Sequence, residues 1–370
     1  MSQDWHFGKK LGEGANGAAF LAFRRDYLTE KPDPSETFVI KKVPLGKEPV
    51  TSKSAKLRET QLLAMIRHPY IVTYEDCFLE DGFLFVIMEF AGGGTMEKYC
   101  DAGTPPVPLE LVYDSFVQCL LAVEYLHGHR IVHRDLKPAN VFVLPDNSVK
   151  LGDLGEGWLR GDSADSGDVQ ERWASDPAQQ GSIVGTPFYL APECWRGDCA
   201  DLDLADVWAL GVLLYELCGK SRPFLGKSIH ALALTVCKDP LRPPPGTGRG
   251  TLRGYPDDKL GAVVERMLDK DPAQRYTCQQ LLAMPCLAEA VMRNRRPEDE
   301  WDAAETSGAR GGVRAAAPPP TFLYQFGGGA GPRCVGAISL FLCLSVCLSV
   351  CRARARALSL ALSLCAHVYT

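Results

Sequence analysis

The sequence predicts an α+β protein of two lobes, a small strand-rich lobe that ends at about Met88 and a larger, mostly helical lobe after it. Two observations carry this prediction. Phe38–Lys41 is a short run of β-branched and aromatic residues that ends in lysine, which is typical of a strand. Leu109–Leu126 repeats apolar residues at helical spacing, which predicts a firmly packed helix in the second lobe.

Composition bounds the class of protein. With 370 residues, of which 46% are hydrophobic, the chain can build two lobes and still leave a tail. The net charge of −5, without a basic stripe interleaved with aromatic residues, gives no reason to expect nucleic acid as a partner. The 14 cysteines include no Cys-x-x-Cys pair, and Met1–Lys10 is too polar for a secretory signal. We therefore expect reduced thiols and a cytoplasmic or nuclear protein.

The most informative motif is His133–Asn140, followed at a fixed distance by Asp153-Leu154-Gly155. Phosphoryl transfer has a loose, charge-spread transition state, so a protein that catalyses it mainly positions reactants and neutralises oxygens. Asp135 is expected to orient and deprotonate a substrate hydroxyl, and Lys137 to meet the γ-phosphate. Asn140 and Asp153 supply the oxygen ligands that Mg²⁺ prefers. His-Arg-Asp alone is usually a solvated loop, but the second motif outweighs that interpretation.

A glycine-rich segment lies upstream. Gly12, Gly14 and Gly17 form a Gly-x-Gly-x-x-Gly pattern, which by itself also suits a tight hairpin or a dinucleotide-binding turn. No crossover-helix pattern follows, so we favour a β-turn lid whose N–H groups approach phosphates. Lys41 is expected to hold the α- and β-phosphates. Its predicted partner is Glu59, in the helical pattern at 54–65, and a surface ion pair is the alternative role for Glu59.

Taken together, residues 5–292 resemble a eukaryotic serine/threonine protein kinase and are most similar to the NIMA-related (Nek) kinases. The segments that carry the resemblance are HRDLKPANVF (133–142), KLGDLG (150–155), GTPFYLAPE (185–193) and DVWALGVLLYEL (206–217). The resemblance implies ATP and Mg²⁺ as cofactors and protein substrates that offer serine or threonine hydroxyls. Most kinases have valine at the position of Ala19 and alanine at the position of Val39, so the small and the branched side chain are swapped here, as in Nek-like sequences. If both cover adenine, this exchange conserves volume and costs little.

The resemblance also implies roles for residues of the nucleotide site. Met88 is placed as the gatekeeper in front of adenine. The hinge is placed at residues 89–92, where the backbone of Glu89 and Ala91 would hydrogen-bond adenine.

The resemblance likewise implies roles for residues of the large lobe. Asp206 opens a strongly apolar segment that resembles the buried central helix of the large lobe, and is implied to anchor the catalytic loop. Glu193 and Arg275 match a pair that holds the substrate-binding segment to the lobe. Thr186 matches a threonine that contacts the catalytic aspartate and lysine, which favours serine and threonine over tyrosine as acceptors.

The same resemblance sets the domain boundaries. The kinase domain covers 1–292, with the small lobe at about 1–88, the hinge at 89–92 and the large lobe at 93–292. The activation segment is placed at 153–193, and its acidic stretch at 162–180 is expected to be a disordered insertion.

A regulatory site is expected in this segment. Ser182 falls where Nek-like kinases carry their activating residue. Its phosphorylation adds roughly −1.5 to −2 charge that Arg134 can bind, and so can order the segment. The phosphate would come from an upstream kinase or from self-phosphorylation, and a solvated loop serine is the alternative. Glu156 occupies a site that is usually apolar, so the preference between serine and threonine stays open.

The tail differs from the domain in composition. Residues 293–333 are rich in Pro, Gly, Ala and Arg and are expected to form a flexible linker. Residues 334–370 are a low-complexity hydrophobic tail, in which the uncharged stretch Cys334–Cys351 is at the lower edge of the length of a membrane-spanning helix. A C-terminal membrane anchor is the minor alternative to a low-complexity repeat.

Two other functions stay open. A pseudokinase or scaffold would keep the fold without catalysis, but it would have no chemical need for Lys41, Glu59, Asp135, Asn140 and Asp153 together. An active kinase outside the Nek group is the second alternative, because fold and motifs do not fix substrate choice. No coiled-coil heptads follow the domain, so the oligomeric state is open as well.

Overall fold

The computed structural model describes residues 5–14, 17–25, 32–45, 66–154, 158–159, 186–198, 201–242 and 257–296. Contact clustering divides the chain into two units, Met1–Ala309 and Arg310–Thr370, and every described residue belongs to the first. The predicted helix at 54–65, the insertion at 162–180 and the tail at 334–370 lie outside the described residues.

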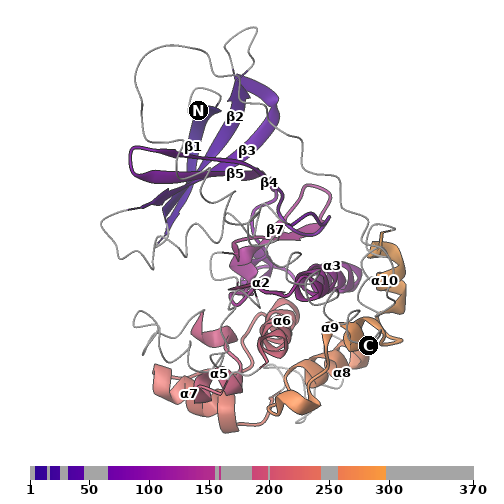
Figure 1. Ribbon diagram of the computed structural model, residues 1–370. Helices are drawn as coiled ribbons and strands as arrows, with labels where there is room; N and C mark the ends of the chain where they lie inside the picture. Colours follow the sequence, from indigo (N-terminus) through magenta and orange to yellow (C-terminus); the bar gives the residue numbers. More distant parts are fainter. Residues whose placement is uncertain are drawn as a thin grey trace, which may run out of the picture. The chain divides into compact units, whose positions relative to one another are not determined.

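The first part of the chain forms a five-stranded antiparallel sheet in the order β1-β2-β3-β5-β4 (Figure 1). Its strands are β1 (Trp5–Gly14), β2 (Gly17–Arg25), β3 (Pro32–Pro44), β4 (Tyr74–Glu80) and β5 (Phe83–Glu89). The predicted strand at Phe38–Lys41 lies within β3. Among the described residues up to Glu89, strands therefore dominate, as predicted.

The register of the sheet separates two faces. Ile40 and Ile87 pair across β3 and β5 and are fully buried with Trp5 and Phe85 in an aromatic cluster that closes one face. On the opposite face, Val39 pairs with Met88, Lys41 with Val86, and Ala19 with Lys41. Because side chains alternate along a strand, these five residues share one face, and it is the face that carries the predicted nucleotide-binding side chains.

Two long helices form the centre of the second part, α3 (Leu109–Gly128) and α6 (Leu202–Gly219). The predicted apolar positions of α3 are all buried: Val112, Phe116, Leu120, Val123 and Leu126. In α6, every residue from Asp206 to Leu217 is buried, which accounts for its lack of a polar face. The Asp201 side chain accepts hydrogen bonds from two backbone N–H groups of the first turn of α6 and so caps the helix.

The remaining elements complete the helical part. They are α2 (Glu97–Cys100), α5 (Pro192–Arg196), α7 (Ile229–Lys238), α8 (Asp258–Met267), α9 (Cys278–Leu282) and α10 (Ala288–Asn294), with 3-10 turns at Pro138–Asn140, Pro187–Tyr189 and Pro272–Gln274. Short strand pairs flank the predicted catalytic loop: β6 (Ile131–Val132) with β9 (Trp158–Leu159), and β7 (Val141–Val143) with β8 (Val149–Leu151). No helix of the described residues combines the length and apolar character needed to cross a membrane.

The packed structure continues past residue 292, where composition placed the start of the linker. Asn294, the last residue of α10, is buried; its Oδ1 accepts from Gln118 of α3 at 2.7 Å, and its backbone carbonyl accepts from the Tyr70 hydroxyl at 2.6 Å. The prediction from composition placed these residues in the linker because a charged helix end has the composition of a linker, and its packing partners are not visible in the sequence.

The cysteines differ in part from the prediction of reduced thiols. Seven described cysteines are free, but Cys194 is disulfide-bonded.

Candidate active site

The glycine pattern forms the end of the β1–β2 hairpin. Gly14 pairs with Gly17, and Gly12 with Ala19. Gly17 has φ +129°, and a Cβ added there would lie 2.2 Å from the carbonyl oxygen of Lys42, so only glycine fits. At Gly12, by contrast, an added Cβ would meet no atom within 4 Å. The hairpin therefore presents open backbone at Gly12 on the strand pair that carries Ala19.

Lys41 reaches from the sheet to the second motif. Its Nζ lies 2.8 Å from Oδ1 of Asp153, and the two side chains are 14% and 38% exposed. Burial alone would raise the pKa of the Asp153 carboxyl, but the Lys41 ammonium outweighs burial and holds this pKa below its ordinary value. Asp153 is therefore an anion at neutral pH. Glu59, the predicted partner of Lys41, lies outside the described residues.

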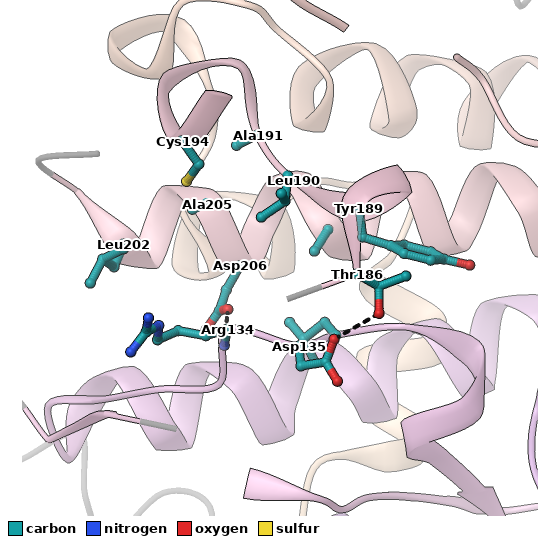
Figure 2. A pocket seen from close by; sticks show the side chains of 12 residues that line it. Arg134, Asp135, Thr186, Tyr189, Leu190, Ala191, Cys194, Leu202, Ala205 and Asp206 are labelled. Carbon is teal, nitrogen blue, oxygen red and sulfur yellow. Dashed lines mark hydrogen bonds between the residues drawn. The ribbon is translucent and has the colours of Figure 1, made fainter. Parts of the chain in front are cut away.

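The catalytic loop is held by Asp206 of α6. Its two carboxylate oxygens accept hydrogen bonds from the backbone N–H groups of His133, at 2.8 Å, and Arg134, at 2.9 Å. Figure 2 shows the bond to Arg134. Arg134 has φ +69°, a conformation that costs free energy in a non-glycine residue. The buried Asp206 compensates for this strain, so the contact expected from the resemblance is present in the structure.

His133 ties the loop to the second motif. Its Nε2 lies 3.2 Å from the carbonyl oxygen of Gly152, and its Nδ1 accepts from the backbone N–H of Asp135 at 3.4 Å. These partners assign the tautomer with the proton on Nε2. The imidazole is fully buried. Through its two nitrogens it links Gly152, the residue before Asp153, to Asp135.

Three side chains bind the carboxylate of Asp135. Its Oδ2 accepts from Lys137 Nζ at 2.6 Å and from Asn140 Nδ2 at 3.0 Å. Its Oδ1 accepts from the Thr186 hydroxyl at 3.0 Å, and that hydroxyl in turn accepts from Lys137 at 2.9 Å. Figure 2 shows Thr186 and Asp135 turned toward each other and joined by this hydrogen bond. The structure thus brings together Asp135, Lys137, Asn140 and Thr186 as the sequence predicted.

Asn140 and Asp153 fit a hard cation. The amide nitrogen of Asn140 is used by Asp135, so the amide oxygen, which is the ligand atom, points away from that carboxylate. Asp153 is anionic and keeps a second oxygen beyond the one bound by Lys41. Among the described residues, no group of three His, Cys, Asp or Glu side chains forms a self-sufficient metal site. One carboxylate and one amide, completed by phosphates and water, match the way Mg²⁺ is usually bound.

The predicted hinge begins at the end of β5. Met88 pairs with Val39, and the N–H of Glu89 donates to the carbonyl of Thr73 at 3.0 Å. The N–H of Glu89 is therefore already used within the fold. Ala91, two residues on, is buried.

Sequence reasoning missed a charged residue that touches the hinge. Lys150 of β8 donates to Oε2 of Glu89 at 2.8 Å. Lys150 belongs to the segment KLGDLG, but nothing in that segment indicates a partner 61 positions away.

A second missed residue lies behind the catalytic loop. His127, at the end of α3, has Nε2 at 3.0 Å from Oδ2 of Asp206 and Nδ1 at 3.9 Å from the Cys278 sulfur. Burial would lower the pKa of His127, but its hydrogen bonds to Asp206 and Cys278 outweigh burial and raise the pKa to about 9. His127 is therefore a buried imidazolium at neutral pH, paired with the carboxylate that anchors the loop.

The segment after Thr186 forms one wall of a pocket beside Asp135. Leu190, Leu202 and Ala205 supply apolar surface, while Asp135 and Thr186 lie at its polar edge (Figure 2). The pocket therefore combines apolar lining with the carboxylate of Asp135 and the hydroxyl of Thr186.

The wall is fixed to the rest of the helical part by two acidic residues. Glu193 forms a buried bidentate pair with Arg275, at 2.6 and 3.0 Å, as the resemblance implied. The Tyr189 hydroxyl donates to Glu216 of α6 at 2.5 Å.

Ser182 and Glu156 lie outside the described residues, so the structure does not place the predicted regulatory serine. Arg134, its predicted partner, lines the pocket.

The family model for the protein kinase domain matches residues 5–287. The chain is 32% identical to serine/threonine-protein kinase Nek3 of Mus musculus over 289 residues, 78% of this chain and 50% of that protein. It is 30% identical to Nek5 of Homo sapiens over 293 residues, 78% of this chain and 37% of that protein. Nek4 of Mus musculus is also 30% identical, over 278 residues, 74% of this chain and 31% of that protein. This chain thus spans half or less of the length of these relatives.

Proposed function

Because the chain belongs to the protein kinase family and is of the Nek type, we propose that it transfers the γ-phosphate of ATP to serine or threonine hydroxyls of protein substrates. The observation that carries this proposal is the convergence of Lys137, Asn140 and Thr186 on the carboxylate of Asp135, with Asp153 held by Lys41.

The residues around Asp135 suit the transfer step. Asp135 orients the substrate hydroxyl and accepts its proton, while Lys137 stands 2.6 Å from that carboxylate and meets the charge of the transferred phosphoryl group. Thr186 bridges the two side chains and keeps the carboxylate aimed at the pocket. Asn140 and Asp153 would hold Mg²⁺, which when bound neutralises phosphate oxygens.

The sheet face supports the nucleotide. Ala19, Val39 and Met88 lie on the same face as Lys41 and provide apolar cover for adenine. The carbonyl of Glu89 accepts from the adenine amine, and open backbone at Gly12 lets phosphates approach. A scaffold without catalysis would require none of this combination, so the full set favours an active enzyme over the pseudokinase alternative.

The decisive experiment replaces the proton acceptor. Asp135→Asn should lower kcat for transfer of radiolabelled phosphate to a peptide library by roughly 10²- to 10⁴-fold, because the amide cannot accept the proton. Asp198→Asn, which changes an exposed carboxylate, is the matched control and should leave kcat unchanged. Equal transfer by the wild type and by Asp135→Asn would refute the mechanism, whereas ATP binding without transfer by the wild type would favour the scaffold.

Control by phosphorylation is a second part of the proposal. A phosphate on Ser182 would bind Arg134 in the catalytic loop and order the segment before Thr186, only four residues away in sequence. An upstream kinase or self-phosphorylation would add it.

Ser182→Ala should therefore lower kcat by roughly tenfold, and Ser182→Glu should recover part of the loss. Ser175→Ala, in the expected insertion, is the control. Activity measured on protein whose phosphorylation has been mapped by mass spectrometry tests this. Unchanged turnover in Ser182→Ala would contradict the switch.

We also propose a cytoplasmic or nuclear location. Seven free cysteines among the described residues support a reducing compartment, whereas the disulfide at Cys194 does not. Imaging of the full chain fused to a fluorescent reporter tests this, and a membrane-bound signal would favour the anchor in residues 334–370 instead.

A further inference from the structure

The strand that leads to Asp153 also holds the hinge. Lys150 Nζ donates to Oε2 of Glu89 at 2.8 Å, and the backbone N–H of Thr73 donates to the same oxygen at 3.2 Å. The N–H of Glu89 returns a bond to the carbonyl of Thr73 at 3.0 Å. The hinge carboxylate is thus bound from two segments that are distant from it in sequence.

This ion pair is shielded from solvent. The side chains of Lys150 and Glu89 are 14% and 29% exposed, compared with 72% and 40% for the surface pair Arg242 and Asp239. Screening by water and salt is therefore weaker at Lys150 than at a surface pair, and the interaction restrains its partners more strongly.

The residues that follow Lys150 connect this ion pair to the proposed metal ligands. The next residue, Leu151, forms two backbone hydrogen bonds to residues 70–72. Its N–H donates to the carbonyl of Tyr70 and its carbonyl accepts from the N–H of Val72, each at 2.8 Å. The N–H of Gly152 then donates to the carbonyl of Asn140 at 3.0 Å. The four residues from Lys150 to Asp153 thus contact the hinge, bind the backbone of Asn140 and include Asp153. A movement of β8 is therefore coupled to the hinge and to both proposed metal ligands.

We propose that Lys150 is a positioning residue of the nucleotide site: through Glu89 it fixes the adenine-binding hinge relative to the strand that presents Asp153 to the phosphates. This inference rests on the proposed function. Without Lys150, the side chain of Glu89 keeps only the backbone donor at Thr73, and the distance between the adenine end and the phosphate end of the site is less restrained. A nucleotide that contacts both ends then binds a less preorganised site.

A purely structural role makes a different prediction. Loss of a structural pair lowers the melting temperature and the fraction of active protein, but it leaves the KM for ATP in the surviving active molecules unchanged. A positioning role raises the KM for ATP while the KM for the peptide substrate stays constant.

The test compares Lys150→Met, Lys150→Arg, Glu89→Gln and the control Lys227→Met, an exposed lysine on the loop before α7. Loss of about 1 kcal/mol of positioning corresponds to about a fivefold higher KM for ATP in Lys150→Met and in Glu89→Gln. The kcat and the KM for peptide should change less than about twofold, since neither residue touches Asp135. Lys150→Arg keeps the charge and should restore the KM for ATP. The double variant of Lys150→Met and Glu89→Gln should be no worse than either single variant, because both remove the same ion pair.

Calorimetric titration with Mg-ATP is run beside the kinetics. It separates this inference from the proposed function, because wild type that binds ATP without transferring phosphate refutes the kinase reaction while the dissociation constants still test Lys150. An unchanged dissociation constant and KM for ATP in Lys150→Met would overturn the inference. A rise in kcat in that variant would also overturn it, because the pair would then restrain turnover.

Discussion

At the scale of single residues, the carboxylate of Asp135 is fixed through both of its oxygens. Lys137 and Asn140 bind one oxygen and Thr186 binds the other. A carboxylate held on both sides does not have to reorganise when a hydroxyl arrives, which is what general-base catalysis requires. In the proposed reaction, the hydroxyl of Thr186 would therefore position the base without reacting itself.

Thr186→Ala should lower kcat by about tenfold, the effect expected for loss of about 1 to 1.5 kcal/mol of hydrogen bonding to a charged group. The melting temperature should stay close to that of the wild type, because Thr186 is only half-buried. Thr186→Ser keeps the hydroxyl and should recover most of the activity. If Thr186→Ser is as slow as Thr186→Ala, the methyl group rather than the hydroxyl carries the effect.

At the scale of elements, the catalytic loop depends on the contact between the end of α3 and the start of the buried part of α6. His127 closes α3 and Asp206 begins that part of α6, with 3.0 Å between Nε2 and Oδ2. Asp203 Oδ1 lies 3.7 Å from the same ring nitrogen, so two carboxylates face the imidazolium. Because Asp206 also holds the strained Arg134, the charge on His127 stabilises the loop indirectly.

This contact makes stability depend on pH. The pKa of His127 is raised from 6.5 in the unfolded chain to about 9 in the fold, so its stabilising contribution is fully present below about pH 6.5 and is lost as the pH rises through about 9. The free energy of unfolding of the wild type, minus that of His127→Gln, should therefore decrease between pH 7 and about pH 10.

Urea unfolding at several pH values measures this difference, and the subtraction removes groups that titrate in both proteins. His230→Gln, at an exposed histidine of α7, is the control and should show no such trend. A pH-independent difference for His127→Gln would mean that the imidazole is neutral in the fold.

At the scale of the whole molecule, Arg275 joins parts of the helical region that are far apart in sequence. Its guanidinium binds both oxygens of Glu193 and the carbonyl oxygen of Leu204, and it lies 5.1 Å from the ring of Trp208. The side chains of Arg275 and Glu193 are 0% and 5% exposed. Removal of one partner therefore leaves a buried charge without compensation.

Arg275→Met should lower the free energy of unfolding by about 3 to 5 kcal/mol, the cost of breaking a buried pair from one side. The corresponding fall in melting temperature is on the order of 10 °C for a domain of this size. Arg242→Met breaks an exposed pair and should cost less than about 1 kcal/mol. Equal melting temperatures for the two variants, measured by calorimetry, would show that the buried pair is not a stability determinant.

The sequence by itself determined the family, the two-part α+β fold and the residues that meet at Asp135. Its motifs name side chains whose types the chemistry requires, and its apolar spacing predicts α3, because both signals are local in the chain. The helix α6 was expected from the resemblance of its unbroken apolar segment to the central helix of the family. Only the tertiary structure decided that Lys150 holds Glu89, that His127 lies between Asp206 and Cys278, and that Asn294 is buried at the end of α10. These contacts join positions 61 to 224 residues apart. No local period encodes them, since they arise from how the sheet and helices pack rather than from the order of neighbouring residues.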